Sequence, residues 1–249
     1  MDFSVIIPFY NTPVKTLEKA CSSVVSSFLN HVNLNITYSS HELKIILVND
    51  GSIICYNDFL DSFKRNVNFD FISISYFRNE INLGRSYSRN LGLKISNSQF
   101  VSFLDSDDVY MINFFSTFFE TYSINPNFDF YTFSYKLNNF FVFRINFRSL
   151  FRYSNWKYFN TNSFVLDHNK CNTFFYDEDL SKGEDIKYFF NLIRFKKGLH
   201  TNIVVSIYYY DYKSYHCRFK FKFLKILFYF FKFTIPYFIY KEKNYSIVS

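Results

Sequence analysis

The first hundred residues alternate short apolar runs with longer stretches whose apolar positions recur at helical spacing. Residues 5–8 and 44–48 are too short for helices and too apolar for loops, so they are typical of buried strands. Between them, residues 16–29 place apolar side chains such as Leu17 and Val24 on one face of a helix. A strand, a helix and a strand in this order predict a βαβ unit.

The same alternation continues along the chain. Residues 71–76 alternate like a third strand, residues 85–95 have a helical pattern, and residues 100–104 form a fourth apolar run. We therefore expect an α/β fold with a parallel sheet in the first part of the chain.

Beyond Tyr110 the pattern weakens. Residues 112–122 look helical, and residues 128–147 look like strands or a hairpin with Asn138-Asn139 as the turn. Gly183 then precedes an apolar helical pattern over residues 186–193. No internal repeat or long linker is visible, so these elements are expected to extend the same domain.

Composition favours a globular protein in a reducing compartment. With 249 residues, 49% of them hydrophobic, the chain has enough apolar material for one large domain or a domain with a small appendage. Its four cysteines stand singly, which indicates neither a zinc site nor a disulfide framework. A strand begins almost at the N-terminus, where a secretory signal would need a basic segment and a long apolar one. We expect a cytoplasmic protein.

The basic excess lies largely near the C-terminus. The formal net charge is +7, and residues 218–241 interleave lysine and arginine with aromatic and aliphatic residues. A helix of this kind either rests on an anionic membrane surface or buries its aromatic side chains on the domain. No uncharged run there approaches the ~20 residues that span a bilayer. Peripheral contact at the inner face of the cell membrane is one expectation, and a packed helix is the other.

Carboxylates stand where two of the predicted strands end. Asp50 follows residues 44–48, and Asp105, Asp107 and Asp108 follow residues 100–104. Parallel sheets bind ligands at the carboxyl edge, and carboxylate oxygens suit hard divalent cations. A run of Asp and Ser is also an ordinary turn and helix cap, with Asp108 as the capping residue. Considered alone, the acidic run leaves both interpretations open.

Four segments in order carry a resemblance to a known family: residues 5–11 (VIIPFYN), 48–52 (VNDGS), 82–92 (NLGRSYSRNLG) and 103–108 (FLDSDD). Together they resemble the nucleotide-sugar domain of the family 2 glycosyltransferases, closely to about residue 110 and more loosely to Ile193. The resemblance implies a GT-A fold, with a Rossmann-like, mostly parallel central sheet flanked by helices. It divides the chain into a nucleotide-sugar part (1–110), an acceptor part of the same domain (111–215) and a basic aromatic tail (216–249).

The resemblance also implies roles for the acidic residues. Asp107 would coordinate Mn²⁺ or Mg²⁺, and Asp105 would lie near the ribose and the metal shell. Asp50 would accept a hydrogen bond from the base, although Asn49 replaces the more usual acidic first residue of that motif. A carboxylate is a suitable acceptor for a base N–H.

Four further residues are implied to bind the nucleotide. Pro8 and Tyr10 match the segment on which the base packs, and Arg85 and Arg89 match the helix start beside the nucleotide. Guanidinium groups suit both phosphate and carboxylate. Arg89 therefore has two open roles, one as a nucleotide ligand and one as a support for an aspartate of the site.

Glu184-Asp185 resembles the acidic pair at the acceptor side of the same family, which makes Asp185 the candidate general base. An acidic first turn that interacts with the helix dipole is the alternative. The histidines have no metal-ligand spacing, and no Gly-x-Gly-x-x-Gly or P-loop segment occurs. The expected function is inverting, metal-dependent transfer of a sugar, with UDP as the expected carrier, to a hydroxyl of a glycan or lipid-linked glycan in surface polysaccharide synthesis, without a nucleic-acid partner.

Two other functions remain as alternatives. A sugar-phosphate nucleotidyltransferase also uses a parallel sheet and a metal, but it would carry a glycine-rich basic loop after the first strand, where this chain has Pro8-Phe9-Tyr10-Asn11. A catalytically weak, nucleotide-binding scaffold for other glycosyltransferases would lose Asp107 or Asp185, and both are present.

Overall fold

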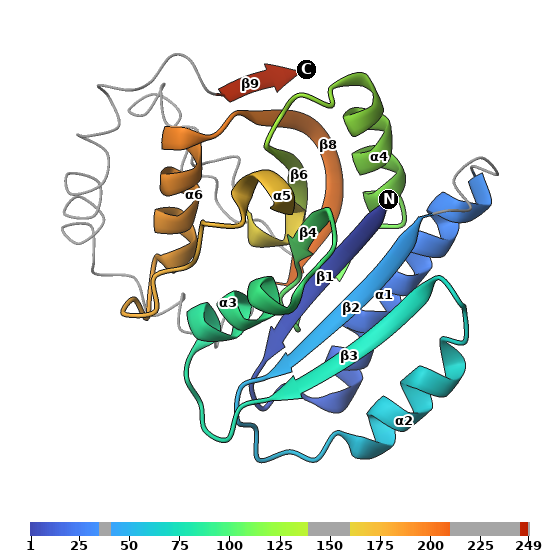
Figure 1. The fold of residues 1–249 in the computed structure, drawn as a ribbon. Coiled ribbons are helices and arrows are strands. Elements are labelled where there is room, and N and C mark those ends of the chain that lie inside the picture. Colours follow the sequence, from blue (N-terminus) through green and yellow to red (C-terminus); the bar gives the residue numbers. More distant parts are fainter. Residues whose placement is uncertain (35–40, 139–159, 210–244, 249) are drawn as a thin grey trace.

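The computed structural model describes residues 1–34, 41–138, 160–209 and 245–248, and their strands form one mixed sheet flanked by helices on both faces (Figure 1). The sheet order is β3-β2-β1-β4-β7-β6-β8-β5, and β9 pairs with β8. The strands are β1 (Asp2–Phe9), β2 (Glu42–Asn49), β3 (Ile72–Arg78), β4 (Phe100–Phe103), β5 (Val109–Tyr110), β6 (Phe130–Asn138), β7 (Phe164–Asp167), β8 (Gly198–Tyr209) and β9 (Tyr245–Val248).

Strand direction divides the sheet into two parts. The first four strands of the order pair in parallel, so β3, β2, β1 and β4 end at one edge. β7 is antiparallel to both β4 and β6, whereas β6 pairs with β8 in parallel. The expected α/β fold with a mostly parallel sheet is confirmed.

Helices cover the two faces. On one face lie α1 (Val14–Leu34), α2 (Asn57–Asn66) and α4 (Phe114–Ile124), and on the other lie α3 (Arg85–Ile95), α5 (His168–Cys171) and α6 (Glu184–Phe195) (Figure 1). A 3-10 turn, η4 (Thr161–Ser163), precedes β7. The helices predicted over residues 85–95, 112–122 and 186–193 correspond to α3, α4 and α6, whereas α2 carries few apolar residues and was not predicted.

Alternation along the central strands supplies both hydrophobic cores. Val5 and Ile7 of β1 pack with the buried aromatics of α1 and α4, whereas Ile6 packs with α3, α5 and α6. Successive side chains of a strand point to opposite faces, so a run of consecutive apolar residues is what a sheet covered on both sides requires. This is why the short apolar runs were strong strand signals.

The helix-cap alternative for the acidic run is wrong. The acidic run after β4 does not cap a helix, because Asp108 is followed directly by β5 and the N-cap of α4 is Asn113. Tyr110 of β5 is fully buried, and its hydroxyl hydrogen-bonds to that of Ser102. Burial of Tyr110 and pairing with β8 therefore keep the chain extended at the point where a helix start was expected.

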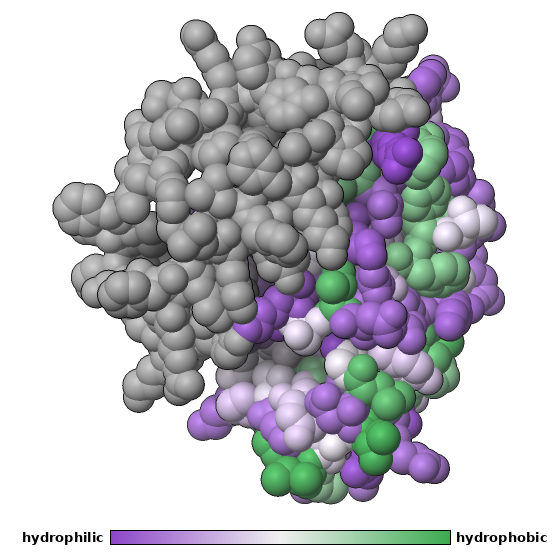
Figure 2. All heavy atoms as spheres, turned by 90° about the vertical axis from the view of Figure 1, so that its left-hand side faces the viewer, coloured by the Kyte–Doolittle hydropathy of each residue, from purple (hydrophilic) through white to green (hydrophobic). Residues whose placement is uncertain are grey.

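Two further expectations fall partly or wholly outside the described residues. Of the strands predicted over residues 128–147, the structure describes β6, and the turn at Asn139 lies beyond the described part. The basic aromatic segment 218–241 lies wholly outside it. Among the helices that the structure does describe, none is long and apolar enough to span a bilayer. Seen from the left-hand side of Figure 1, the described part of the surface mixes hydrophilic and hydrophobic residues (Figure 2).

Candidate functional site

The loops that follow β1, β2, β3 and β4 contact one another at the carboxyl edge of the parallel strands. After β1, the backbone N–H of Asn11 donates to the Ser52 hydroxyl at 2.8 Å, and its side-chain oxygen accepts from the Ile53 N–H at 2.9 Å. Asn11 adopts a positive φ of 51°, which asparagine tolerates better than most residues. The first two sequence segments of the resemblance are thus joined by hydrogen bonds.

Asp50 fastens the second of these loops to the third. Its Oδ1 accepts from the Asn79 side chain at 2.8 Å and from the Leu83 N–H at 2.9 Å, while Oδ2 accepts from the Gly84 N–H at 2.8 Å. Asp50 is buried, and three donors leave part of its acceptor capacity unused, since an ionised carboxylate has about four acceptor positions. The carboxylate holds the loop before α3 in place.

Gly51 explains why the turn after Asp50 contains glycine. Its φ is +74°, and a Cβ placed there would lie 2.4 Å from the backbone carbon of Ile81. The backbone of the second loop therefore lies directly against that of the third. A side chain at this position would displace one of the two loops.

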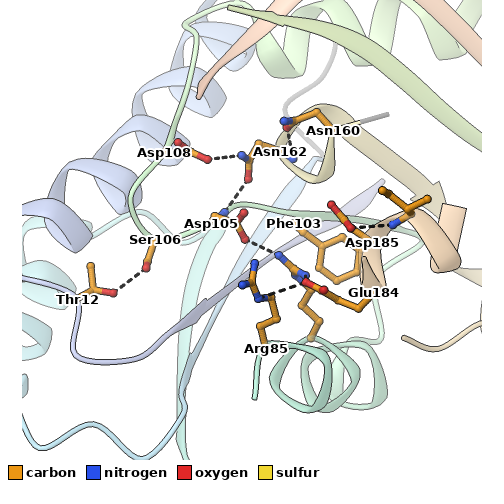
Figure 3. Close-up of polar contacts among 12 residues, drawn as sticks. Thr12, Arg85, Phe103, Asp105, Ser106, Asp108, Asn160, Asn162, Glu184 and Asp185 are labelled. Atoms are coloured by element: carbon orange, nitrogen blue, oxygen red, sulfur yellow. Dashed lines mark hydrogen bonds and ion pairs between the residues drawn. The ribbon is translucent and has the colours of Figure 1, made fainter. Parts of the chain in front are cut away.

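The acidic loop after β4 is fixed from three directions (Figure 3). The Ser106 hydroxyl lies 2.8 Å from the Thr12 hydroxyl of the first loop, and the Asp105 backbone N–H donates to the Asn162 side-chain oxygen at 2.7 Å. Asp105 Oδ1 accepts from Arg89 Nη2 at 2.6 Å. Asp105 thus stands between α3 and η4.

Asp108 is the buried member of this loop. Its Oδ1 accepts from the Tyr209 N–H at 2.6 Å, and its Oδ2 accepts from the Asn162 side chain. Burial raises the pKa of Asp108 to about 8, and repulsion by Asp105 and Asp107 adds to this, although the two donors favour the ionised form. Asp108 therefore anchors the loop to the end of β8.

Asn162 is a site residue that the sequence did not reveal. It is 1% exposed and serves the acidic loop with both its oxygen and its nitrogen. No recognisable motif surrounds it, and it lies 54 positions after Asp108. Its placement depends on the return of the chain through β7.

Asp107 is the member of the acidic loop that reaches solvent. Among the described residues, no three His, Cys, Asp or Glu side chains are grouped to hold a metal ion. Asp107 with Asp105 instead offers one or two carboxylates, which is the number that Mg²⁺ uses when phosphates and waters complete its shell. The donor set fits a cation that binds together with a diphosphate.

The acidic pair at the start of α6 lies near the acidic loop, and Arg89 of α3 contacts a carboxylate from each (Figure 3). Glu184 is 3% exposed and lies 3.2 Å from Arg85 Nε and 3.5 Å from Arg89 Nη1. Asp185 is half-buried, and its Oδ1 accepts from the Ile186 N–H at 2.8 Å. The first turn of α6 thus places one carboxylate among arginines and leaves the next one accessible.

The remaining predicted residues take different positions. Pro8 lies inside β1 and is buried, whereas Tyr10 in the following loop is 50% exposed. Arg85 has a half-exposed side chain, and Arg89 is fully enclosed. Of the two roles left open for Arg89, its contacts with Asp105 and Glu184 match support of the acidic residues.

The chain is similar to known proteins in sequence and in fold. The family described as "Glycosyl transferase family 2" matches residues 4–179. The Escherichia coli UDP-Glc:alpha-D-GlcNAc-diphosphoundecaprenol beta-1,3-glucosyltransferase WfgD is 32% identical over 111 residues, which are 44% of this chain and 36% of WfgD. The curated relatives are matched over less than half of their length.

Two solved structures share the fold. S. aureus TarS 1–349 in complex with UDP-GlcNAc has a TM-score of 0.61 at 19% identity, covering 89% of this chain and 62% of that one. The mannosyltransferase PcManGT from Pyrobaculum calidifontis, in complex with GDP-Man and Mn²⁺, has a TM-score of 0.65 at 12% identity, covering 87% and 59%.

Proposed function

Because this chain belongs to glycosyl transferase family 2, we propose that it transfers a sugar from a nucleoside diphosphate to a hydroxyl group, with inversion at the anomeric carbon. UDP is the proposed carrier and a hexose the proposed sugar. The proposed acceptor is a glycan or a lipid-linked glycan of a surface polysaccharide, by analogy with the acceptor in the name of WfgD.

One observation carries this proposal. The four loops at the carboxyl edge hydrogen-bond to one another, and the last of them carries Asp105 and Asp107. Arg89 links Asp105 to Glu184, the neighbour of Asp185 in the first turn of α6 (Figure 3). A site for sugar transfer needs an anchor for the diphosphate and a base for the acceptor, on either side of the anomeric carbon. The sequence places these groups about 80 residues apart, and the fold assembles them.

On the donor side, the proposed roles follow exposure. Asp107 reaches solvent and would bind the cation, and Asp105 would complete that contact and lie near the ribose. A divalent cation held there neutralises negative charge on the departing diphosphate. Tyr10 offers an exposed ring for the base, and Asp50 would accept from a base N–H through its remaining capacity. Arg85 is exposed enough to contact the nucleotide.

On the acceptor side, Asp185 is the proposed general base. Its carboxylate takes the proton of the acceptor hydroxyl as that oxygen bonds to the anomeric carbon. The bond from that carbon to the phosphate oxygen breaks, and the diphosphate leaves with its electron pair. Residues 1–110 would thus form the donor half of the domain and residues 111–215 the acceptor half, on one continuous sheet.

The test uses the purified chain and Mn²⁺ with a panel of UDP-glucose, UDP-galactose, UDP-GlcNAc and UDP-GalNAc. We expect release of UDP from at least one donor, and roughly hundredfold slower release for Asp107→Ala. Calorimetry with UDP and Mn²⁺ should show at least a tenfold weaker affinity for the same variant.

Asp179→Asn is the matched control, because Asp179 is an exposed carboxylate outside the site. It should behave like the wild type in both measurements. If no donor is turned over while UDP still binds with Mn²⁺, the chain binds nucleotide without transferring sugar and the proposal fails.

A further inference from the structure

Arg89 is an arginine buried in the middle of the molecule. Its side chain is 2% exposed, and the guanidinium lies between two carboxylates from opposite sides of the site, Asp105 on Nη2 and Glu184 on Nη1. Burial alone would lower its pKa, but these two carboxylates raise the pKa above the ordinary value. Arg89 is therefore a permanent positive charge shared by two anions.

Glu184 is held more firmly than its neighbour in the sequence. Its Oε1 contacts both Arg85 and Arg89, and its side chain is 3% exposed. Arg85 and Arg89 of α3 carry two positive charges, and Asp105 and Glu184 carry two negative ones, so the cluster has no net charge. Removal of one buried partner leaves the others with an uncompensated charge.

The chain leading to Glu184 is also fastened to α3. The Asn90 side-chain oxygen accepts from the Tyr176 N–H at 2.7 Å, and the Asn90 side-chain nitrogen donates to the Tyr176 carbonyl at 2.9 Å. The Tyr176 ring lies 5.1 Å from the Arg89 guanidinium and stacks on Tyr188 of α6 at 4.1 Å. Adjacent residues of α3 therefore hold both ends of the segment from Tyr176 to Glu184.

We propose that Glu184 is a positioning residue that couples the donor carboxylate Asp105 to the acceptor base Asp185 through Arg89. This inference depends on the proposed sugar transfer and adds a role that the acidic pair alone does not assign. With Glu184 in place, Arg89 divides its interaction between two anions, and Asp105 keeps the orientation that the cation and the ribose need. The same contact fixes the first turn of α6, and with it the backbone of Asp185.

The coupling predicts an effect at a distance. Glu184→Gln retains the shape of the side chain but removes its charge, so Arg89 interacts with Asp105 alone and competes with the ligand for that carboxylate. We expect a three- to tenfold weaker affinity for UDP with Mn²⁺ by calorimetry. We also expect at least tenfold slower release of UDP from the active donor of the panel at saturating donor concentration.

The decisive measurement is a double-mutant cycle. In an Arg89→Lys background, Glu184→Gln should change the affinity for UDP with Mn²⁺ by less than twofold, because the shared guanidinium is already absent. Glu184→Asp, which keeps the charge, should recover part of the donor affinity. If Arg89→Lys does not fold, the comparison of Glu184→Gln with Glu184→Asp still tests the role of the charge.

Lys187→Gln serves as the matched control, because Lys187 is also in α6 and forms an ion pair with Asp177 outside this network. If Glu184 only stabilises the fold, Glu184→Gln should lower the unfolding midpoint, and any change in UDP affinity should not depend on Arg89. The inference is overturned if wild type and Glu184→Gln bind UDP with Mn²⁺ equally, or if the loss persists in the Arg89→Lys background. A wild-type chain that releases no UDP from any donor contradicts the proposed function instead.

Discussion

The acidic loop after β4 and the first turn of α6 each combine a buried carboxylate with a more accessible one, but the buried members are held differently. Within the described part of the chain, Asp108 accepts from two neutral groups, the Asn162 side chain and the Tyr209 N–H. Glu184 lies between two arginines. Neutral donors allow burial to raise the pKa of Asp108, whereas Arg85 and Arg89 place positive charge against Glu184. The first arrangement anchors a loop, and the second connects two sides of a site.

The largest effect should come from the shared arginine. Arg89→Met leaves Asp105 and Glu184 without their common partner, and we expect the free energy of unfolding to fall by roughly 3–5 kcal/mol, the usual range for a broken buried ion pair. Urea denaturation monitored by circular dichroism measures this. A loss below about 1 kcal/mol would mean that the carboxylates reach water when Arg89 is absent.

Substitution of Asp108, which is held by neutral donors, should lower the free energy of unfolding by less. Asp108→Asn directs an amide N–H at either Asn162 or the Tyr209 N–H, and we expect a loss of roughly 1–3 kcal/mol. Asp61→Asn is the control and should leave the urea midpoint nearly unchanged, because Asp61 of α2 is exposed. Equal losses for both variants would show that burial does not distinguish the two residues.

A histidine pair away from the site extends the contrast to buried groups whose charged form is disfavoured by burial. His31 Nε2 and His41 Nδ1 lie 3.1 Å apart, and burial lowers the pKa of each from 6.5 to about 4. The unfolded chain therefore binds more protons between these values, and stability falls as the pH decreases from above 6.5 toward 4. From pH 7.5 to 6.5 the two rings together should cost about 0.7 kcal/mol.

Urea midpoints measured across that pH range test the pair. His41→Phe, which can still stack on Phe119, should have a flatter profile than the wild type. An identical pH dependence in both proteins would assign the effect to other groups.

The smallest effect is expected for the exposed ion pair of α6. Lys187 and Asp177 are about one-third and one-quarter exposed, and such pairs contribute about 0–1 kcal/mol. Lys187→Gln should therefore lower the unfolding free energy by less than about 0.5 kcal/mol, with most of that difference removed by 1 M salt. A larger loss of unfolding free energy that is insensitive to salt would mean that this ion pair contributes to stability as the buried pair of Arg89 and Glu184 does.

Much of the structure at the carboxyl edge of β1 to β4 was predictable because its signals are local. Each of the first four strands is an apolar run. The residues that directly follow such a run are the ones that lie at the carboxyl edge of the sheet. Asp50 and Gly51 are adjacent because a single turn needs both of them. Gly51 allows the turn to approach the backbone of Ile81, and the Asp50 carboxylate binds the loop before α3. Asp108 as a helix cap was wrong because the local pattern does not report its pairing with Asn162.

By itself, the sequence determined the parallel strands, the helices α3 and α6, and the grouping of Asp50, Asp105 and Asp107 at one edge, because period and turn chemistry act over a few residues. Only the tertiary structure decided which acid is buried and what pairs with it. Arg89 contacts Glu184, which lies 95 positions further along the sequence, and Asn162 contacts Asp108, which lies 54 positions before it. No local sequence pattern indicates contacts between residues so far apart in the sequence. Burial and charge pairing are properties of the assembled sheet and its helices.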